Sequence, residues 1–254
     1  MKDKIVILNW KAYLGIEESR KLAKKIAVMT IPDGIKMVLA PSDIALYAVK
    51  ESITDSELLI AAQNLDVEGK GAYTGCTSAD QIIEAGCKYV LLGHSEVRRR
   101  MEGLAGGNEA VGEKFAIALA KGLVPIVCIG ETLEEKDKGL SKNIMEKQLR
   151  PIIKHIKDDK SKFYIGYEPV WAISSSKSST SADANHILEI FAQIKEILGE
   201  NSENVAMVYG GSINEENIGN YASLPFIDGL LIGKAGTSTD RVKSMLLKLQ
   251  QIYQ

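Results

Sequence analysis

Cysteine and histidine are scarce in this 254-residue sequence, with three of each. The cysteines, at positions 76, 87 and 128, form neither a Cys-x-x-Cys pair nor a zinc pattern, which argues against a disulfide framework and favours a reducing compartment. Because no histidine stands at ligand spacing from another His or Cys, no metal site is expected. His155 and His186 fall within helical patterns among charged residues, and we expect both at the solvated surface.

The sequence also lacks long apolar runs and a dominant basic stripe. No apolar stretch approaches membrane-spanning length, and the run at residues 5–8 is too short for a signal peptide, so a cytoplasmic location is expected. The formal net charge is -2 with 25% charged residues, which gives no sign of nucleic-acid binding. We therefore expect neither a nucleic acid nor a membrane among its partners.

Short apolar runs recur along the chain, in which 45% of residues are hydrophobic. The runs are apolar at nearly every position, a pattern typical of parallel strands buried on both faces. Most are followed by longer amphipathic stretches that indicate helices. Strands are expected at residues 5–8, 37–40, 58–62, 89–92, 124–129, 163–167, 205–209 and 229–232, and helices at 19–29, 113–121, 144–156, 184–198 and 241–253.

Eight strands that alternate with helices in a chain of this length predict an α/β fold, a (β/α)8 TIM barrel with a single domain over residues 1–254. A doubly wound sheet is the alternative, but no Gly-x-Gly-x-x-Gly motif follows the first expected strand. No Pro- or Gly-rich linker divides the chain. The Ser-rich segment 174–181 follows the sixth expected strand, and we interpret it as a loop.

In such a barrel, functional side chains gather where the strands end. Glu168 follows the sixth expected strand and precedes Pro169, beside a loop that could close over it, which suits a general base. His94 ends the fourth expected strand and could be a proton donor, an electrophile or a structural residue. Lys11 follows the first and could supply a fixed cation or be a snorkelling surface lysine. Each residue taken alone also has a structural explanation, which for Glu168 is as good as the functional one.

Two glycine-containing turns follow the seventh and eighth expected strands, Gly210-Gly211-Ser212 and Gly233-Lys234. Glycine lets backbone N–H groups approach an anion closely, and a following helix N-terminus adds a favourable dipole. Each turn alone could be an ordinary tight turn. Together, after the last two strands of a barrel, they predict a phosphate site.

Several segments, in order along nearly the whole chain, share one resemblance. They are residues 9–11 (Asn-Trp-Lys), 62–64 (Ala-Gln-Asn), 71–75 (Gly-Ala-Tyr-Thr-Gly), 93–96 (Gly-His-Ser-Glu), 128–135 (Cys-Ile-Gly-Glu-Thr-Leu-Glu-Glu), 167–173 (Tyr-Glu-Pro-Val-Trp-Ala-Ile), 209–212 (Tyr-Gly-Gly-Ser) and 228–233 (Asp-Gly-Leu-Leu-Ile-Gly). Each motif is weak alone. Together they resemble the triosephosphate isomerase family.

The resemblance implies an intramolecular aldose–ketose isomerase of glycolysis and gluconeogenesis that interconverts dihydroxyacetone phosphate and D-glyceraldehyde 3-phosphate. It implies no metal and no organic cofactor. Glu168 would move a proton between neighbouring carbons, and neutral His94 would polarise the carbonyl. Lys11 and Asn9 would stabilise the negative charge of the enediolate, and Glu96 would pair with Lys11 or support the base.

The same resemblance implies how substrate and partner are held. The segment 169–177 would close over the substrate and exclude water. A homodimer is implied through the loop around Thr74, which would reach into the partner's site. The residues expected to bind the phosphate or the rest of the substrate, besides Asn9, are Ser174, Gly211, Ser212, Gly233 and Lys234.

Several residues depart from the family pattern around the three catalytic candidates. They leave two alternatives open: an isomerase of a four-carbon sugar phosphate of the erythrulose phosphate type, and a non-catalytic phosphosugar-binding member. Intact Lys11, His94 and Glu168 argue against the second. The departures are Ser174–Ser176 in place of Gly-Thr-Gly, Val97 in place of Arg, Cys76 in place of an acid, Lys234 in place of Gly, Ala12-Tyr13 in place of Met-Asn, and a longer segment 98–107.

Overall fold

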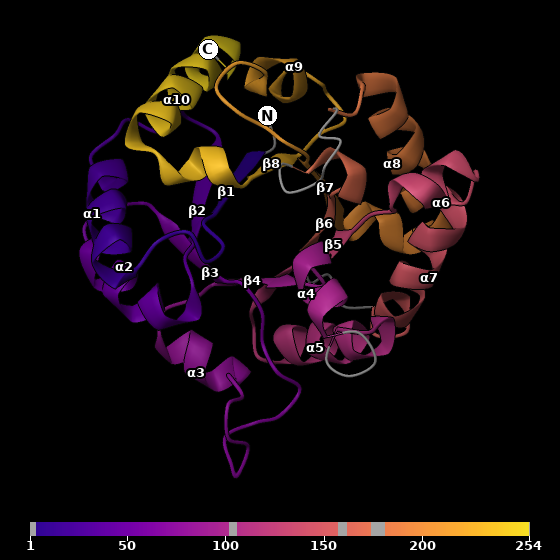
Figure 1. The fold of residues 1–254 in the computed structure, drawn as a ribbon, viewed down its shortest axis with the longest axis horizontal. Coiled ribbons are helices and arrows are strands. Elements are labelled where there is room, and N and C mark those ends of the chain that lie inside the picture. Colours follow the sequence, from indigo (N-terminus) through magenta and orange to yellow (C-terminus); the bar gives the residue numbers. More distant parts are fainter. Residues whose placement is uncertain (1–3, 102–105, 157–161, 174–180, 254) are drawn as a thin grey trace.

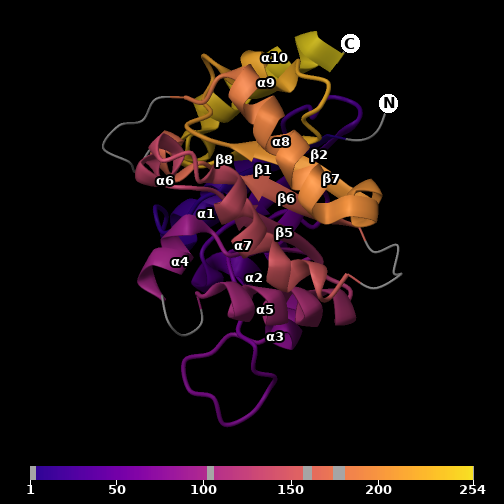
Figure 2. The same cartoon turned by 90° about the vertical axis from the view of Figure 1, so that its right-hand side faces the viewer.

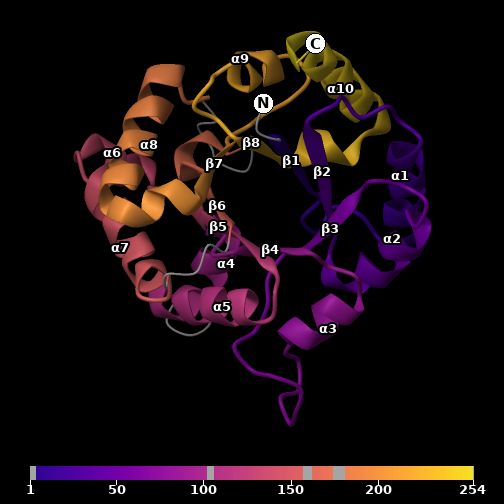
Figure 3. The same ribbon diagram turned by 180° about the vertical axis from the view of Figure 1, so that it is seen from behind.

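The computed structural model describes residues 4–101, 106–156, 162–173 and 181–253, and within these residues eight parallel strands form one closed barrel in chain order. β8 pairs with β1 and closes the ring, so the expected (β/α)8 barrel is confirmed. Figures 1 and 3 show the strands enclosed by a ring of helices. The strands are β1 (Lys4–Asn9), β2 (Ile35–Ala40), β3 (Leu59–Ala62), β4 (Tyr89–Leu92), β5 (Val124–Ile129), β6 (Phe163–Tyr167), β7 (Val205–Gly210) and β8 (Gly229–Ile232).

Both faces of the strands are buried, which explains why their sequences are apolar at nearly every position. In β1, Ile5 and Ile7 belong to a cluster made of strand residues alone, which fills the barrel interior. Val6 and Leu8 belong to a second cluster that also contains helix residues, between barrel and helices. Successive side chains of a strand point to opposite faces, so one apolar run supplies both clusters.

The expected strands are confirmed in position, and four of them match in both bounds. The others differ by one or two residues: β1, β2 and β7 are longer than expected because the backbone ladder extends beyond the apolar residues, whereas β3 begins one residue later than expected. Lys4 pairs with Ile35, and Asn9 pairs with Ala40, so β1 and β2 begin earlier than their apolar runs and β1 ends later.

The five expected helices are also present, but four of them begin earlier than expected. Apolar periodicity marks the buried face of a helix, whereas its first turn is polar and set by capping. The Glu18 side chain accepts the N–H of Gly15 at 2.8 Å, and α1 begins at Ile16 for this reason. The main helices are α1 (Ile16–Ala27), α5 (Asn108–Ala120), α7 (Ser141–Ile153), α8 (Ala184–Leu198) and α10 (Thr239–Tyr253).

The structure adds shorter helical segments that the sequence pattern did not predict. Fewer than two turns cannot display a helical period, so apolar spacing gives no signal for them. Four of them, α4, α6, η2 and η4, connect a strand end to the next main helix, and most of the others connect one strand to the next. They are α2 (Leu46–Ser52), α3 (Ala79–Glu84), α4 (Ser95–Arg100), α6 (Leu133–Asp137), α9 (Ile218–Ala222), and the 3-10 helices η1 (Asp43–Ala45), η2 (Val170–Ala172), η3 (Gly199–Asn204) and η4 (Lys234–Thr237).

The connection between β3 and α3 extends away from the barrel, as Figures 1 and 2 show. Its base is held by a pair of hydrogen bonds: the Asp66 N–H donates to Thr77 O at 2.9 Å, and the Thr77 N–H donates to Asp66 Oδ2 at 2.7 Å. Thr74, Tyr73 and Cys76 are exposed in this loop. The loop is therefore anchored at its base, and an ion pair between Lys70 Nζ and Glu84 Oε2, 3.1 Å apart, joins it to α3 farther along.

Candidate active site

The alternation of side chains along each strand continues at the strand ends and directs polar residues into the barrel mouth. In β6, Ile165 and Tyr167 belong to the cluster between barrel and helices, so Glu168 follows on the inward side. In β1, Ile7 points inward, and Asn9, two residues on, does so too. The strand register thus brings these two polar residues to the same end of the barrel interior.

The structure brings the three predicted catalytic residues together. His94 Nε2 lies 3.4 Å from Glu168 Oε2, and Lys11 Nζ lies 2.9 Å from Glu96 Oε1. His94 is 4% exposed and Glu168 is 7% exposed. A pocket of about 250 Å³ beside them is lined by Asn9, Lys11 and Glu168. Glu96 therefore pairs with Lys11, one of the two arrangements expected for it.

Lys11 has a left-handed backbone, with φ 48°, which is uncommon for a residue with a side chain. Two neighbours hold it in place. The Lys11 N–H donates to Asn9 Oδ1 at 3.0 Å, and Gln63 Nε2 donates to Lys11 O at 2.9 Å and to Ala40 O at 3.0 Å. These bonds fix the direction in which the ammonium group leaves the strand, and strained backbone of this kind concentrates at functional sites.

His94 precedes α4, and its ring orientation is fixed by that helix. Nδ1 accepts the backbone N–H of Glu96 at 3.2 Å, so in the neutral ring the proton resides on Nε2, the nitrogen that faces Glu168. Burial lowers the pKa of His94, whereas the Glu168 carboxylate raises it, and the net shift is upward. In the described part of the chain, His94 Nε2 and Glu168 Oε2 are both buried and neither makes a hydrogen bond.

Glu168 is held ionised in a buried position. Burial raises its pKa, but the His94 ring and the Lys11 ammonium group lower it by more, and the pKa of Glu168 lies below the ordinary value. The same carboxylate, together with burial, raises the pKa of the Cys128 thiol, which is therefore neutral. An ionised carboxylate with an unused oxygen in a confined space has the properties of a base.

Two glycines make room for Glu168. A Cβ atom on Gly130 would lie 2.0 Å from the carbonyl oxygen of Glu168, and one on Gly210 would lie 2.6 Å from Glu168 Cγ. The Glu168 N–H donates to Ile129 O at 2.8 Å, which ties the backbone of Glu168 to β5. The position of the carboxylate is thus determined from two sides by residues that lack a side chain.

The residues of both predicted phosphate turns line the same pocket as Lys11. They are Gly211, Ser212, Gly233 and Lys234. A Cβ atom on Gly233 would lie 3.6 Å from Lys11 Cε, so the cation lies directly beside the second turn. Ser212 has φ 48°, the other left-handed residue with a side chain among the described residues. These two turns face a permanent positive charge, which suits an anion.

The segment expected to close over the substrate is described only at its start. Ser174 lies outside the described residues, as do residues 175–177 and residues 102–105 of the longer segment. The described start, η2, is joined to the phosphate turn, because the Ser212 hydroxyl donates to Ala172 O at 2.7 Å. One hydrogen bond thus joins the start of the closing segment to the predicted phosphate turn at residues 210–212.

Sequence reasoning missed a buried hydrogen-bond cluster around Glu131. Glu131 is 0% exposed, and its Oε1 accepts from the Trp171 indole at 2.8 Å and from the Tyr167 hydroxyl at 3.0 Å. His186 Nε2 lies 3.0 Å from the same hydroxyl, and its side chain is 17% exposed. The expectation that His186 is a solvated surface residue is therefore wrong. The helical spacing of His186 among charged residues gave no signal of these partners, although Glu131, two residues after the end of β5, could have suggested a strand-end role.

The expectation for His155 also needs correction, since this residue lies just beyond the end of α7 and is half-buried. The helical pattern was extended to residue 156, whereas α7 ends at Ile153.

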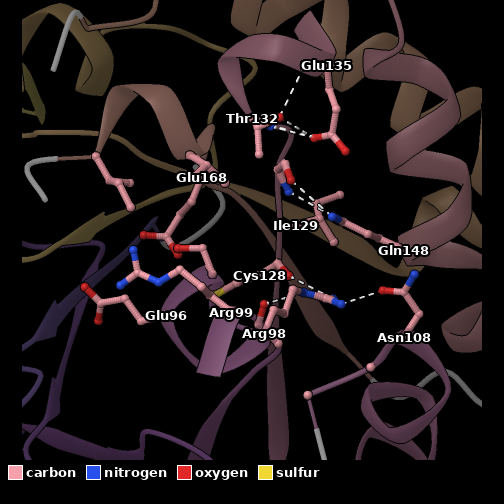
Figure 4. Close-up of a pocket in the computed structure, with 17 residues that line it drawn as sticks. Glu96, Arg98, Arg99, Asn108, Cys128, Ile129, Thr132, Glu135, Gln148 and Glu168 are labelled. Carbon is pink, nitrogen blue, oxygen red and sulfur yellow. Dashed lines mark hydrogen bonds between the residues drawn. The ribbon is translucent and has the colours of Figure 1, made fainter. Parts of the chain in front are cut away.

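A second cavity, of about 420 Å³, lies beside Glu168 (Figure 4). It shares Glu168 and Ile173 with the first pocket. Arg98 lies on one wall, where its Nε donates to Gly93 O at 2.6 Å and its Nη1 donates to Asn108 Oδ1 at 2.5 Å. Most of the donors of this guanidinium are thus used internally, and the wall is structural.

Within the described ranges, no group of three or more His, Cys, Asp or Glu side chains is arranged to hold a metal ion. No helix in that part of the chain combines the length and the apolar character needed to cross a membrane.

Comparison with known proteins assigns this arrangement to a family. A family model described as triosephosphate isomerase matches residues 4–249. A triosephosphate isomerase of Symbiobacterium thermophilum is 38% identical over 92% of each chain, and one of Pelodictyon phaeoclathratiforme is 38% identical over 94% of this chain and 96% of the relative. One of Moorella thermoacetica is 35% identical over 95% and 96%. With the barrel and the converging strand ends, these matches show that the chain belongs to the triosephosphate isomerase family.

Proposed function

We propose that the protein interconverts dihydroxyacetone phosphate and D-glyceraldehyde 3-phosphate by proton transfer through an enediolate. The observation that carries this proposal is the pair of unused buried atoms, His94 Nε2 and Glu168 Oε2, 3.4 Å apart beside Lys11. A carbonyl with an adjacent C–H group can engage both atoms at once, with its oxygen at the histidine and its carbon at the carboxylate.

The steps follow from the positions of these groups. Glu168 removes a proton from the carbon beside the carbonyl, and the C–H electron pair forms the C=C bond of the enediolate. The carbonyl oxygen becomes negative, and the His94 Nε2–H and the Lys11 ammonium stabilise it. Glu168 then delivers the proton to the former carbonyl carbon. The hydroxyl proton of the other carbon passes by way of His94 to the oxygen of the former carbonyl, so the new carbonyl forms on the carbon that first lost its proton. No atom is gained or lost, so the reaction is an isomerisation.

The substrate phosphate is held by the turns at Gly211–Ser212 and Gly233–Lys234. Both turns line the pocket of Lys11, and the left-handed backbone of Ser212 presents a bend at this point. Binding energy from the phosphate, which takes no part in the chemistry, positions the reacting carbons. We also assign Asn9 and Ser174 to substrate binding and Glu96 to holding Lys11, with which it forms an ion pair at 2.9 Å.

We propose a homodimer formed through the loop around Thr74. Exposed apolar side chains occur on and near the connections that follow the three neighbouring strands β1, β2 and β3, which supports an interface there. They are Tyr13 (47% exposed), Ile44 (75%), Tyr47 (64%) and Tyr73 (46%). Sedimentation of the purified protein, compared with a Thr74→Arg variant, tests this: the variant should sediment as a monomer with reduced turnover, and a monomeric parent protein would contradict the proposal.

We further infer that residues 1–254 form one domain, because the last strand pairs with the first. The three cysteines carry free thiols, which supports a reducing, cytoplasmic setting.

Turnover of glyceraldehyde 3-phosphate, compared with that of the four-carbon erythrulose phosphates, tests the substrate. The relatives named above favour the triose. Preferred turnover of the four-carbon compounds would show the alternative isomerase, and no turnover of either would show a non-catalytic binding protein.

A further inference from the structure

One wall of the substrate pocket is formed by a side chain that none of the motifs above contains. Arg241, in the first turn of α10, lines the pocket together with Ser212, Gly233 and Lys234. The pocket lining therefore carries three cationic side chains, Lys11, Lys234 and Arg241, against one carboxylate, Glu168. This excess of positive charge lies at the end of the pocket where the two phosphate turns are.

Arg241 and Lys234 differ in how far a neighbouring carboxylate neutralises their charge. Arg241 Nε donates to Glu215 Oε2 at 2.6 Å, and both side chains are partly exposed, at 36% and 30%. A guanidinium has five N–H donors, and among the described residues the two Nη groups of Arg241 have no partner. Lys234 is exposed and forms no ion pair within the same residues.

Backbone N–H groups and full charges act differently on a phosphate ester. The N–H groups of a turn fix the position of the oxygens but carry only partial charges. A cation attracts a dianion twice as strongly as a monoanion at the same distance. A guanidinium with free Nη groups can also bond two phosphate oxygens in parallel, which an ammonium group cannot do in a fixed geometry.

We propose that Arg241 and Lys234 form a charged outer wall of the phosphate site that selects the phosphate dianion, and that Glu215 sets how much of the Arg241 charge the ligand experiences. This inference rests on the proposed function for the identity of the phosphate ester. It adds to that function a specificity device made of side chains, which the backbone turns alone do not provide. Arg241 and Glu215 act on the binding of the phosphate and do not touch the reacting carbons, so their substitution should shift KM and the inhibition constant of phosphate in the same direction.

Substitution of Arg241 and substitution of Glu215 should change the affinity for phosphate in opposite directions. Inorganic phosphate, measured as a competitive inhibitor at low ionic strength and pH 8, is the probe. Arg241→Gln removes a cation and leaves Glu215 facing the anion, so the inhibition constant should rise about tenfold, and Lys234→Gln should raise it about threefold. Glu215→Gln leaves Arg241 unopposed, so the inhibition constant should fall about threefold. All three effects should shrink as salt is added.

Lys243→Gln is the matched control, because Lys243 is exposed on the same helix and does not line the pocket. It removes the same charge and should leave the inhibition constant unchanged. In Arg241→Gln, the Glu215 carboxylate loses its partner, which could disturb folding. The Arg241→Gln/Glu215→Gln double variant removes this carboxylate as well. Its inhibition constant for phosphate should lie between those of the parent and of Arg241→Gln.

The inference is overturned if Glu215→Gln fails to tighten phosphate binding, or if Lys234→Gln behaves like the Lys243→Gln control. Calorimetric titration with inorganic phosphate separates this from the proposed function. A chain without isomerase activity that still shows the charge pattern overturns the function and retains the site. An active isomerase whose phosphate affinity ignores all three substitutions retains the function and overturns the site.

Discussion

The two ends of the barrel strands contrast sharply in their chemistry. Toward the start of β1, Ile5 and Ile7 are fully buried, apolar and paired in a regular ladder. At its end, Asn9 is polar and buried, and Lys11 adopts a left-handed backbone. The polar atoms that are buried without a hydrogen bond include His94 Nε2 and others near the mouth. The regular, apolar part of the strands is rigid. This rigid frame keeps strained backbone and unpaired polar groups in place at the mouth.

The comparison predicts that substitutions at the mouth affect turnover and that substitutions in the interior affect stability. The largest effect is expected for Glu168→Asp, which withdraws the base by one methylene group. Misplacing a reacting group by about 1 Å costs roughly 100-fold or more, so kcat should fall by about 10²–10³. Inorganic phosphate should bind as before, because the turns that hold it are untouched. Unimpaired turnover of this variant would show that Glu168 is not the base.

Ile7→Ala tests the opposite end of the comparison. Ile7 is fully buried in the interior cluster, and truncation leaves a cavity that the closed barrel cannot collapse around. The free energy of unfolding should fall by about 2–5 kcal/mol. Denaturant titration measures this loss. We expect kcat/KM at 25 °C to stay within about twofold of the parent, since the substitution removes an apolar contact inside the barrel and no polar group of the mouth. Lost turnover without lost stability would contradict the expectation that interior residues act on stability and not on turnover.

Two glycines of neighbouring strands allow a matched test. Gly210→Ala places a Cβ atom 2.6 Å from Glu168 Cγ, whereas Gly166→Ala places one no closer than 3.8 Å to any neighbour. The first should displace the base and lower kcat by about 10–100-fold. The second should leave kcat near that of the parent, because 3.8 Å is ordinary van der Waals contact. Equal kinetics for the two variants would show that Gly210 does not position Glu168.

The smallest effect concerns the cluster around Glu131. Burial raises the pKa of Glu131, but the His186 ring, 3.7 Å away, and hydrogen bonds from Trp171 and Tyr167 lower it by more, so the folded-state pKa lies below the ordinary value. A carboxyl of this kind contributes stability that is complete above its unfolded pKa, about 4.3, and is lost as the pH falls through the folded value. Glu131→Gln should therefore cost about 1 kcal/mol from pH 5 to pH 8.

Thermal unfolding at a series of pH values measures this difference. The gap in Tm between parent and Glu131→Gln should be constant above pH 5 and should narrow below about pH 4. A gap that widens on acidification would mean that the carboxylate is not stabilised by its three partners.

Much of the barrel and the catalytic group could be predicted because both depend on features local to a strand. The run at residues 163–167 shows its burial by composition alone, and the proline after Glu168 marks where the strand ends. The predicted convergence of Lys11, His94 and Glu168 followed from the rule that parallel strands end at one face of a barrel.

The rest depends on contacts between residues distant in the chain, which periodicity cannot show. His186 has the spacing of a surface residue, and its partner hydroxyl belongs to Tyr167, 19 residues earlier. Gly130 and Gly210 look like ordinary turn glycines, yet each is required by the position of Glu168. Arg241 occupies an unremarkable helix position and reaches the pocket only because α10 follows β8 back to β1.

The seam between β8 and β1 has a consequence for synthesis of the chain. One pocket combines Lys11, which is translated early, with Gly233 and Arg241, which are translated near the end. A growing polypeptide therefore contains Lys11 and Glu168 before the last residues of the pocket are made. Under the proposed function, a phosphate ester would stabilise the completed barrel and not the incomplete chain.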